Sequence, residues 1–169
     1  PIGCCMNHLV VSFISPDRPG IVDLLSNVIS NHQGNWQVSS MLHVSGFFAG
    51  IIEVAVQKDK AELLVASLKE LPDIQINIAV AEVASADGAE VTLSLTANDR
   101  TGIVQEISSA IHKQGGNLLR VETSCEPAPH SGQALFKATA HVAVNESNVE
   151  SLVEALESLA DDIMVDVQS

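Results

Sequence analysis

The sequence predicts an α+β protein built from two copies of one small domain, each with the element order βαββαβ. Two observations carry this prediction. The hexapeptide DRPGIV at 17–22 reappears 82 residues later as DRTGIV at 99–104, and both halves show the same succession of strand-like and helix-like hydrophobic periods. A repeat of this length is too long for a solenoid unit and fits a small domain. We expect the first domain at 1–84 and the second at 88–169.

The elements of the first half follow from local patterns. Leu9, Val11 and Phe13 alternate with other residues, which is typical of a strand. After a turn at 15–20, apolar residues over 21–29 follow helical spacing, and Gly34 is expected to end that helix. The remaining elements are expected in the order strand 36–44, turn 45–46, strand 47–56, helix 64–71 and strand 74–80.

The second half repeats this order and differs from the first in one hairpin. Its hairpin carries an insertion at 126–132, and the linker between the halves, at 84–88, is short. The order βαββαβ predicts a ferredoxin-like arrangement, in which two helices cover one face of an antiparallel four-stranded sheet. The elements are expected as strand 91–95, helix 103–111, strands 119–123 and 136–144, helix 149–159 and strand 163–167.

Composition narrows the classes of function. The net charge is −13 with only 8 Lys and Arg, which disfavours direct binding to nucleic acid or to anionic membranes and permits a basic protein partner. The three cysteines form no disulfide framework, and neither a signal peptide nor an apolar run long enough to span a bilayer is visible. We therefore expect a cytoplasmic protein.

The repeated turn offers groups that suit a zwitterion. Pro19 fits the first turn of a helix, Gly20 allows a ligand to approach closely, and the next N–H groups can hold a carboxylate or phosphate. Asp17 can cap the turn and can accept from an ammonium group. Asn35 could reach the turn if the first two strands are neighbours, or it could reach a facing domain. The alternative is an ordinary strand-to-helix turn without a ligand.

The element order, the DRPGIV and DRTGIV turns and the Gly-Asn pairs resemble ACT domains, which sense small ligands, most often amino acids. A chain of two such domains is similar to the glycine-cleavage-system transcriptional repressor family. The resemblance implies regulation through a DNA-binding activator, with glycine as the signal. It also implies that ligands sit where the turn after the first strand meets a neighbouring domain. Thr101 stands where the first turn has Pro19 and leaves the second turn less rigid, so we expect either two sites of different affinity or only one site that binds. The residues implicated are Asp17, Arg18, Pro19, Gly20, Ile21, Asn35, Asp99, Arg100, Thr101, Gly102, Ile103 and Asn117.

The cysteines suggest no further site. Cys4, Cys5 and His8 match no ordinary zinc spacing and lack a second pair of ligands, so an ordinary N-terminal segment is the simpler interpretation. Cys125 falls in a strand, where a buried and inert thiol is expected. No metal or cofactor is predicted.

Two surface features have alternative interpretations. Glu146, Glu150 and Glu154 recur every four residues on the last helix, which predicts a solvated acidic face or a docking surface for a basic partner. Phe47 and Phe48 are adjacent in a strand, so only one of them can face the helices. The other faces the opposite side of the sheet or a partner.

The sequence favours a non-enzymatic regulator of amino-acid metabolism that binds a small metabolite, changes its contact with a protein partner and could form a homodimer. A ligand-independent interaction scaffold is the first alternative. A small enzyme is the second, although no convergent acid–base set or nucleotide motif is visible. An RNA-binding module is disfavoured by the charge and by an aromatic content of 3%.

Overall fold

A computed structural model describes residues 6–81, 89–127 and 134–168. The chain divides into two compact units, Pro1–Ala84 and Ser85–Ser169, which are called unit 1 and unit 2 below. The predicted linker at 84–88, the residues Cys4 and Cys5, and positions 128–132 of the predicted insertion lie outside the described residues.

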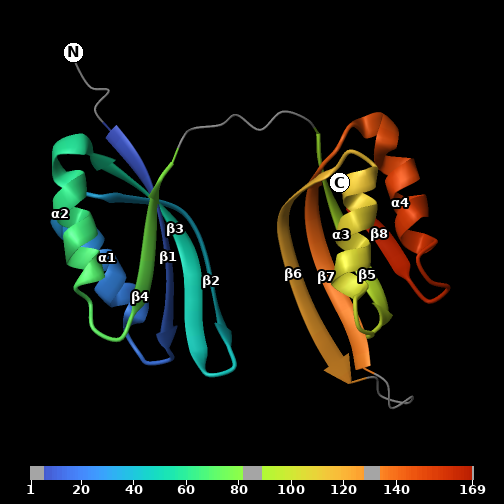
Figure 1. Ribbon diagram of the computed structural model, residues 1–169, viewed down its shortest axis with the longest axis horizontal. Coiled ribbons are helices and arrows are strands. Elements are labelled where there is room, and N and C mark those ends of the chain that lie inside the picture. The colour runs from blue at the N-terminus through green and yellow to red at the C-terminus, as the bar shows by residue number, and fades with distance from the viewer. Residues whose placement is uncertain (1–5, 82–88, 128–133, 169) are drawn as a thin grey trace. The chain divides into compact units, whose positions relative to one another are not determined.

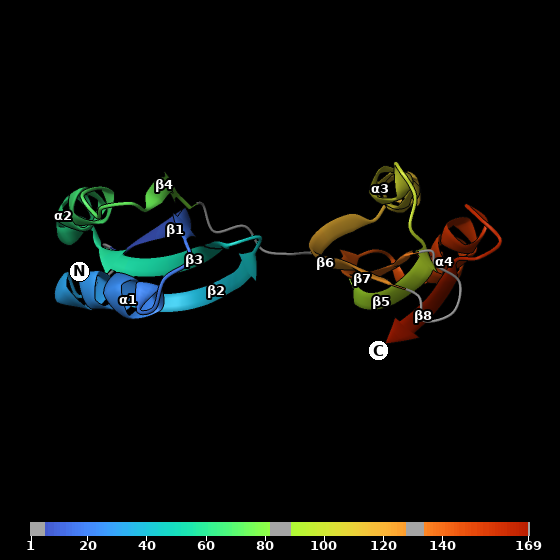
Figure 2. The same ribbon diagram turned by 90° about the horizontal axis from the view of Figure 1, so that it is seen from below.

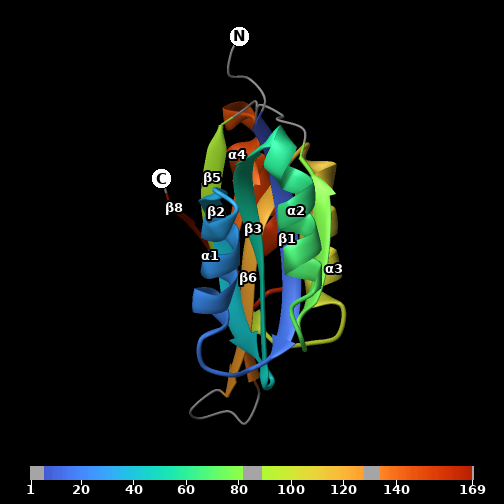
Figure 3. The same cartoon turned by 90° about the vertical axis from the view of Figure 1, so that its left-hand side faces the viewer.

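Unit 1 is a four-stranded sheet with the strand order β2-β3-β1-β4. Every neighbouring pair of strands is antiparallel. In Figure 1 both helices of this unit lie on the same side of the sheet, and Figure 3 shows α1 and α2 side by side in front of β1 and β3. The elements are β1 (Met6–Pro16), α1 (Ile21–Asn31), β2 (Asn35–Val44), β3 (Phe47–Gln57), α2 (Lys58–Lys69) and β4 (Gln75–Val80).

Unit 2 has the same topology, with the antiparallel strand order β6-β7-β5-β8. Its helices also cover one face of the sheet, as Figure 2 shows from a second direction. The predicted fold class is therefore confirmed: the α+β order βαββαβ occurs twice. The elements are β5 (Glu90–Asn98), α3 (Ile103–Lys113), β6 (Asn117–Pro127), β7 (Ala134–Ala143), a 3-10 turn (Glu146–Asn148), α4 (Val149–Glu157) and β8 (Met164–Gln168).

Each unit has its own aliphatic core between its helices and its sheet. Leu64 and Leu68 of α2 are fully buried in unit 1, and Leu152 and Leu156 of α4 are fully buried in unit 2. Each such side chain contributes about 1.5–3 kcal/mol by leaving water. The helical spacing of the apolar residues thus places one stripe of each helix against its own sheet.

The end of α1 differs from the prediction. Gln33, at φ 55°, takes the left-handed conformation there, and Gly34 does not. Gly34 is needed for close packing instead, because a Cβ at this position would lie 2.9 Å from Cγ2 of Ile29. Unit 2 divides these tasks between two glycines: Gly115 is left-handed at φ 77°, and Gly116 makes the close approach.

In unit 1 the sheet face that carries no helices is apolar near the β2–β3 hairpin. The register places its residues opposite one another, Pro16 against Phe47 and Phe47 against Val44. As expected, the two adjacent phenylalanines diverge, since Phe48 packs on the core and Phe47 is exposed. We call the exposed set the apolar patch; it consists of Ile14, Leu42, Val44, Phe47 and Ile51.

Candidate functional site

The turn between β1 and α1 is set by one glycine. Gly20 has φ 89° and ψ 9°, which match the third residue of a type II turn, and Pro19 fits the position before it. The helix therefore begins at Ile21, and Pro19 precedes it instead of lying in its first turn as predicted. Gly102 has the same conformation at φ 83° before α3. We call residues 17–20 loop 1 and residues 99–102 loop 2.

The start of α1 presents free amides to loop 1. The amide of Leu24 donates to the carbonyl of Gly20 at 2.9 Å, which is the first bond of the helix. The amides of Ile21, Val22 and Asp23 come before it and have no helical acceptor, as at any helix start. These groups and the helix dipole favour an anion at this position.

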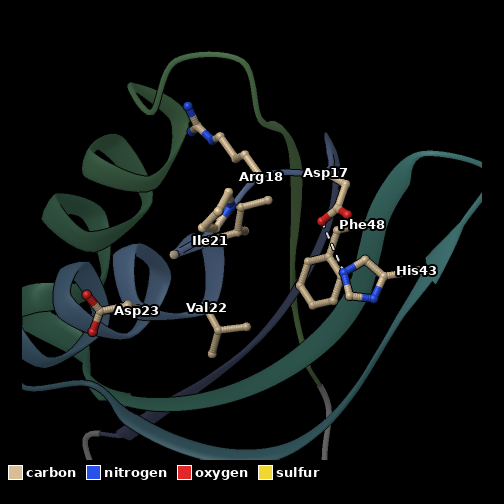
Figure 4. Close-up of a pocket in the computed structure, with 9 residues that line it drawn as sticks. Asp17, Arg18, Ile21, Val22, Asp23, His43 and Phe48 are labelled. Carbon is tan, nitrogen blue, oxygen red and sulfur yellow. Dashed lines mark ion pairs between the residues drawn. The ribbon is translucent and has the colours of Figure 1, made fainter.

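Asp17 does not cap the helix, in contrast to the prediction. Its carboxylate Oδ1 instead lies 3.0 Å from Nε2 of His43 on β2, and Figure 4 shows the two side chains pointing toward one another. The His43 ring stacks obliquely on Phe48, with 4.8 Å between the ring centroids. The backbone amide of Asp17 donates to the carbonyl of Gly46 at 3.0 Å, so the β2–β3 hairpin holds loop 1 in place.

A cavity of about 410 Å³ opens at loop 1 and is lined by residues 17–23 together with His43 and Phe48. Arg18 extends from it toward the turn after α2, where Nη2 lies 3.4 Å from the carbonyl oxygen of Pro72 (Figure 4). The cavity thus combines a carboxylate and the start of a helix with an aromatic wall, and the cationic residue Arg18 lies at its border. This set complements a small molecule that carries both an ammonium and a carboxylate.

The structure separates Asn35 from loop 1. β3 lies between β1 and β2, so the two strands that the prediction required to be neighbours are not adjacent. Asn35 pairs with Ala55, whereas His43 pairs with Phe48. These positions are eight residues apart along β2, or about 26 Å. Asn117 occupies the same far position in unit 2 at the start of β6.

Sequence reasoning missed His43 and Phe48. Neither belongs to the repeated hexapeptide, and the hairpin brings both to loop 1 from distant positions. The 82-residue shift places Cys125 at the position of His43, so no repeat marked this residue. The register confirms the equivalence, since Cys125 pairs with Phe136 as His43 pairs with Phe48.

Loop 2 keeps the backbone of loop 1 and changes its side chains. The amide of Asp99 donates to the carbonyl of Ala134 at 2.9 Å, as Asp17 does to Gly46. Arg100 forms an ion pair with Glu106 of α3.

Cys125 is exposed, not buried as predicted. Its strand borders the edge of the sheet, so no neighbouring strand covers it on one side. Desolvation by nearby atoms, together with the charge and hydrogen bond of the Asp99 carboxylate, raises the pKa of the Cys125 thiol.

The remaining candidate features concern metal ions, membranes and the acidic face. Within the described ranges, no group of three His, Cys, Asp or Glu side chains is placed to hold a metal ion. No described helix has the length and apolar character needed to cross a membrane. Glu146, Glu150 and Glu154 are all exposed, as a solvated acidic face requires.

The known proteins that match this chain are solved structures. No family model and no curated protein matches the sequence. An unknown protein from Galdieria sulphuraria is 30% identical with a TM-score of 0.83, over 96% of this chain and 98% of that one. A putative glycine cleavage system transcriptional repressor is 16% identical over 96% of both chains, and its TM-score of 0.68 shows a shared fold. The chain belongs to the same family as the Galdieria protein and has the fold of a tandem ACT-domain protein.

Proposed function

We propose that this protein is a non-enzymatic regulator of amino-acid metabolism, which binds a small amino acid at loop 1 and acts on transcription through a protein partner. The cavity at loop 1 is the observation that carries the proposal, because its lining brings together Asp17, Arg18 and the first residues of α1. The tandem ACT fold supports a ligand-binding regulatory role.

Each charged end of an amino acid has a partner in this cavity. The carboxylate is placed between Arg18 and the start of α1, where the arginine's charge and the helix dipole both stabilise negative charge. The ammonium group is placed on Asp17, in competition with His43 at 3.0 Å. Glycine is the first ligand to test, because the neighbour that shares the fold is described as a putative glycine cleavage system transcriptional repressor.

Regulation follows by thermodynamic linkage. A ligand that binds Asp17 breaks its contact with His43, which links loop 1 to the end of β2. A partner that contacts this region then binds the free and the ligand-bound states with different affinity. The net charge of −13 favours a basic partner over direct contact with nucleic acid, and a DNA-binding activator is one such partner.

Thermal melting with a panel of amino acids, glycine and serine first, tests the proposal. A ligand present at 100 times its Kd stabilises the native state by about 2.7 kcal/mol, which is visible as a higher Tm. Asp17→Asn is expected to abolish the shift without lowering the Tm of the free protein. Asn35→Ala, at the far end of β2, serves as the control and should keep the shift. A flat panel for the wild-type protein contradicts the proposal.

The apolar patch of unit 1 favours a second candidate, a ligand-independent interaction scaffold. The patch contains no charged side chain, so a second copy of the chain can pack against it without burying an unpaired charge. Sedimentation velocity at rising concentration should then show a dimer that Ile51→Asp disrupts. Thr139→Asp, at the matching position of unit 2, is the control and should leave the dimer intact.

A further inference from the structure

We propose that the two loops have different roles: loop 1 binds the ligand, whereas loop 2 holds a carboxylate of its own chain, Glu106, where the ligand's carboxylate would bind. The chain then takes one amino acid, not two. This inference rests on the proposed function of loop 1, and it names which of the two repeated turns performs it.

The backbone does not distinguish the loops. Gly20 and Gly102 share the left-handed conformation, at φ 89° and 83°. Both helices start at the next residue, and both loops are tied to the following hairpin through the amide of their aspartate. Any difference in binding must therefore come from the side chains.

The two arginines differ in their partners. Arg100 and Glu106 form an ion pair with 2.5 Å between Nη2 and Oε2. The residue of α1 at the position of Glu106 is Leu24, which packs on the core. Among the residues that the structure describes, Arg18 has no carboxylate partner and only approaches the carbonyl of Pro72 at 3.4 Å. The positive charge of Arg18 is thus available to a ligand, and that of Arg100 is neutralised.

The backbone amides and the aromatic side chain also make loop 2 a poorer ligand site than loop 1. In loop 2 the amide of Ile103 donates to the carbonyl of Arg100 at 3.4 Å, which occupies the first free amide of α3. Phe136, the counterpart of Phe48, is buried in the core of unit 2, whereas Phe48 lines the cavity of unit 1. Loop 2 therefore has fewer free donors and no comparable aromatic surface for a ligand.

Glu106, which stands where unit 1 has Leu24, competes with a ligand for Arg100. A free amino acid at loop 2 must displace a tethered carboxylate from Arg100, and tethering gives Glu106 a high effective concentration there. The ligand class follows as well: a small molecule with one carboxylate and one ammonium group is expected at loop 1. A second negative charge on the ligand would meet Asp23, which lines the same cavity.

Isothermal titration of the full chain with glycine tests the inference, and the amino acid with the largest melting shift replaces glycine if glycine gives none. The wild-type protein is expected to bind one molecule per chain. Arg18→Ala should weaken binding at least about tenfold, since it removes a charge-assisted bond. The matched variant Arg100→Ala should leave the affinity within about twofold. Both arginines are at least one third exposed, so both variants are expected to fold.

A second variant tests the role of Glu106 directly. Glu106→Gln keeps the volume of the side chain and removes its charge, so it frees Arg100 and is expected to add a second, weaker binding event. Two equal sites in the wild-type protein, or a single site in Glu106→Gln, would each overturn the inference and leave the proposed function standing. A loss of binding in Arg100→Ala alone would place the ligand at loop 2 and overturn both the inference and the proposed site at loop 1. Absence of binding by every amino acid would overturn both together.

Discussion

Unit 1 and unit 2 share their buried residues far more closely than their exposed ones. Leu64 and Leu68 have the counterparts Leu152 and Leu156, and all four are fully buried. On the open face of the sheets, by contrast, Ile51 of the apolar patch corresponds to Thr139. The comparison teaches that a repeated fold fixes the core and the turns, because these decide stability, and leaves the surface of each copy free to acquire its own role.

The distribution of charge shows the same divergence. Residues 85–169 hold 13 of the 21 acidic residues and residues 1–84 hold 8, while each half has four Lys and Arg. Three of the acids in the second half, Glu146, Glu150 and Glu154, are exposed at and just before α4. The proposed basic partner is therefore expected to be attracted more strongly to unit 2, whereas the proposed ligand site lies in unit 1.

The largest expected effect tests whether the cores are equivalent. Leu68→Ala and Leu156→Ala should each cost about 2–5 kcal/mol of unfolding free energy, because each deletes a fully buried side chain. Trp36, the only tryptophan, packs against the core of unit 1, so its fluorescence reports that unit, and circular dichroism reports both. In urea, Leu68→Ala should shift the fluorescence transition and Leu156→Ala should not. Equal shifts would show that the units unfold together.

A smaller effect is expected at the glycines that make close contacts. A Cβ at Gly34 or Gly116 would lie 2.9 Å from the isoleucine methyl group of the preceding helix. Substitution by alanine at either site should cost about 1–3 kcal/mol through overpacking. Urea unfolding of both variants is the measurement, with the exposed helical residue Asn27→Ala as the control. A neutral Gly34→Ala would mean that the end of α1 relaxes more easily than that of α3.

These structural features show what could be predicted from the sequence. The alternation at Leu9, Val11 and Phe13 and the helical spacing in α1 depend on neighbours in the chain, so they gave the elements correctly. The order of the strands depends on long-range pairing. For that reason the sequence suggested Asn35 near loop 1 and missed His43, which the hairpin carries there.

The local conformation of the turn was also ambiguous in the sequence. Pro-Gly before a helix fits either the first helical turn or a type II turn, and only the positive φ of Gly20 decides between them. Cys125 was expected to be buried because it lies in a strand, but that strand is at the edge of its sheet. Exposure at an edge depends on the strand order, which local patterns do not give.

Cys125 stands where unit 1 has His43, and the alkylation rate of its thiol reports on its contact with Asp99. Desolvation and, after it, the Asp99 carboxylate disfavour the thiolate and raise the pKa of Cys125, so alkylation near neutral pH should be slow. Asp99→Asn lowers that pKa and should speed the reaction with iodoacetamide several-fold, measured by mass spectrometry in a Cys4→Ser and Cys5→Ser background. Glu122→Gln, an exposed carboxylate on the same strand, is the control. An unchanged rate in Asp99→Asn would contradict the proposed contact.

The smallest expected effect concerns the stability of unit 2. The Arg100–Glu106 pair has side chains 37% and 42% exposed, so solvent screens it and Glu106→Gln should cost well under about 1 kcal/mol. A double-mutant cycle with Arg100→Ala in urea measures this coupling. A coupling of several kcal/mol would mean that Glu106 supports the fold of unit 2, and its effect on binding would then need a different explanation.

The tie between each loop and its hairpin has a practical consequence for protein engineering. The aspartate amide is anchored at Gly46 in unit 1 and at Ala134 in unit 2, although the second hairpin is six residues longer by sequence. The anchor therefore tolerates extra chain beyond it. A short epitope or fluorophore-binding peptide introduced between Ser45 and Gly46 should leave loop 1 in place and turn the hairpin tip into an attachment point for a reporter.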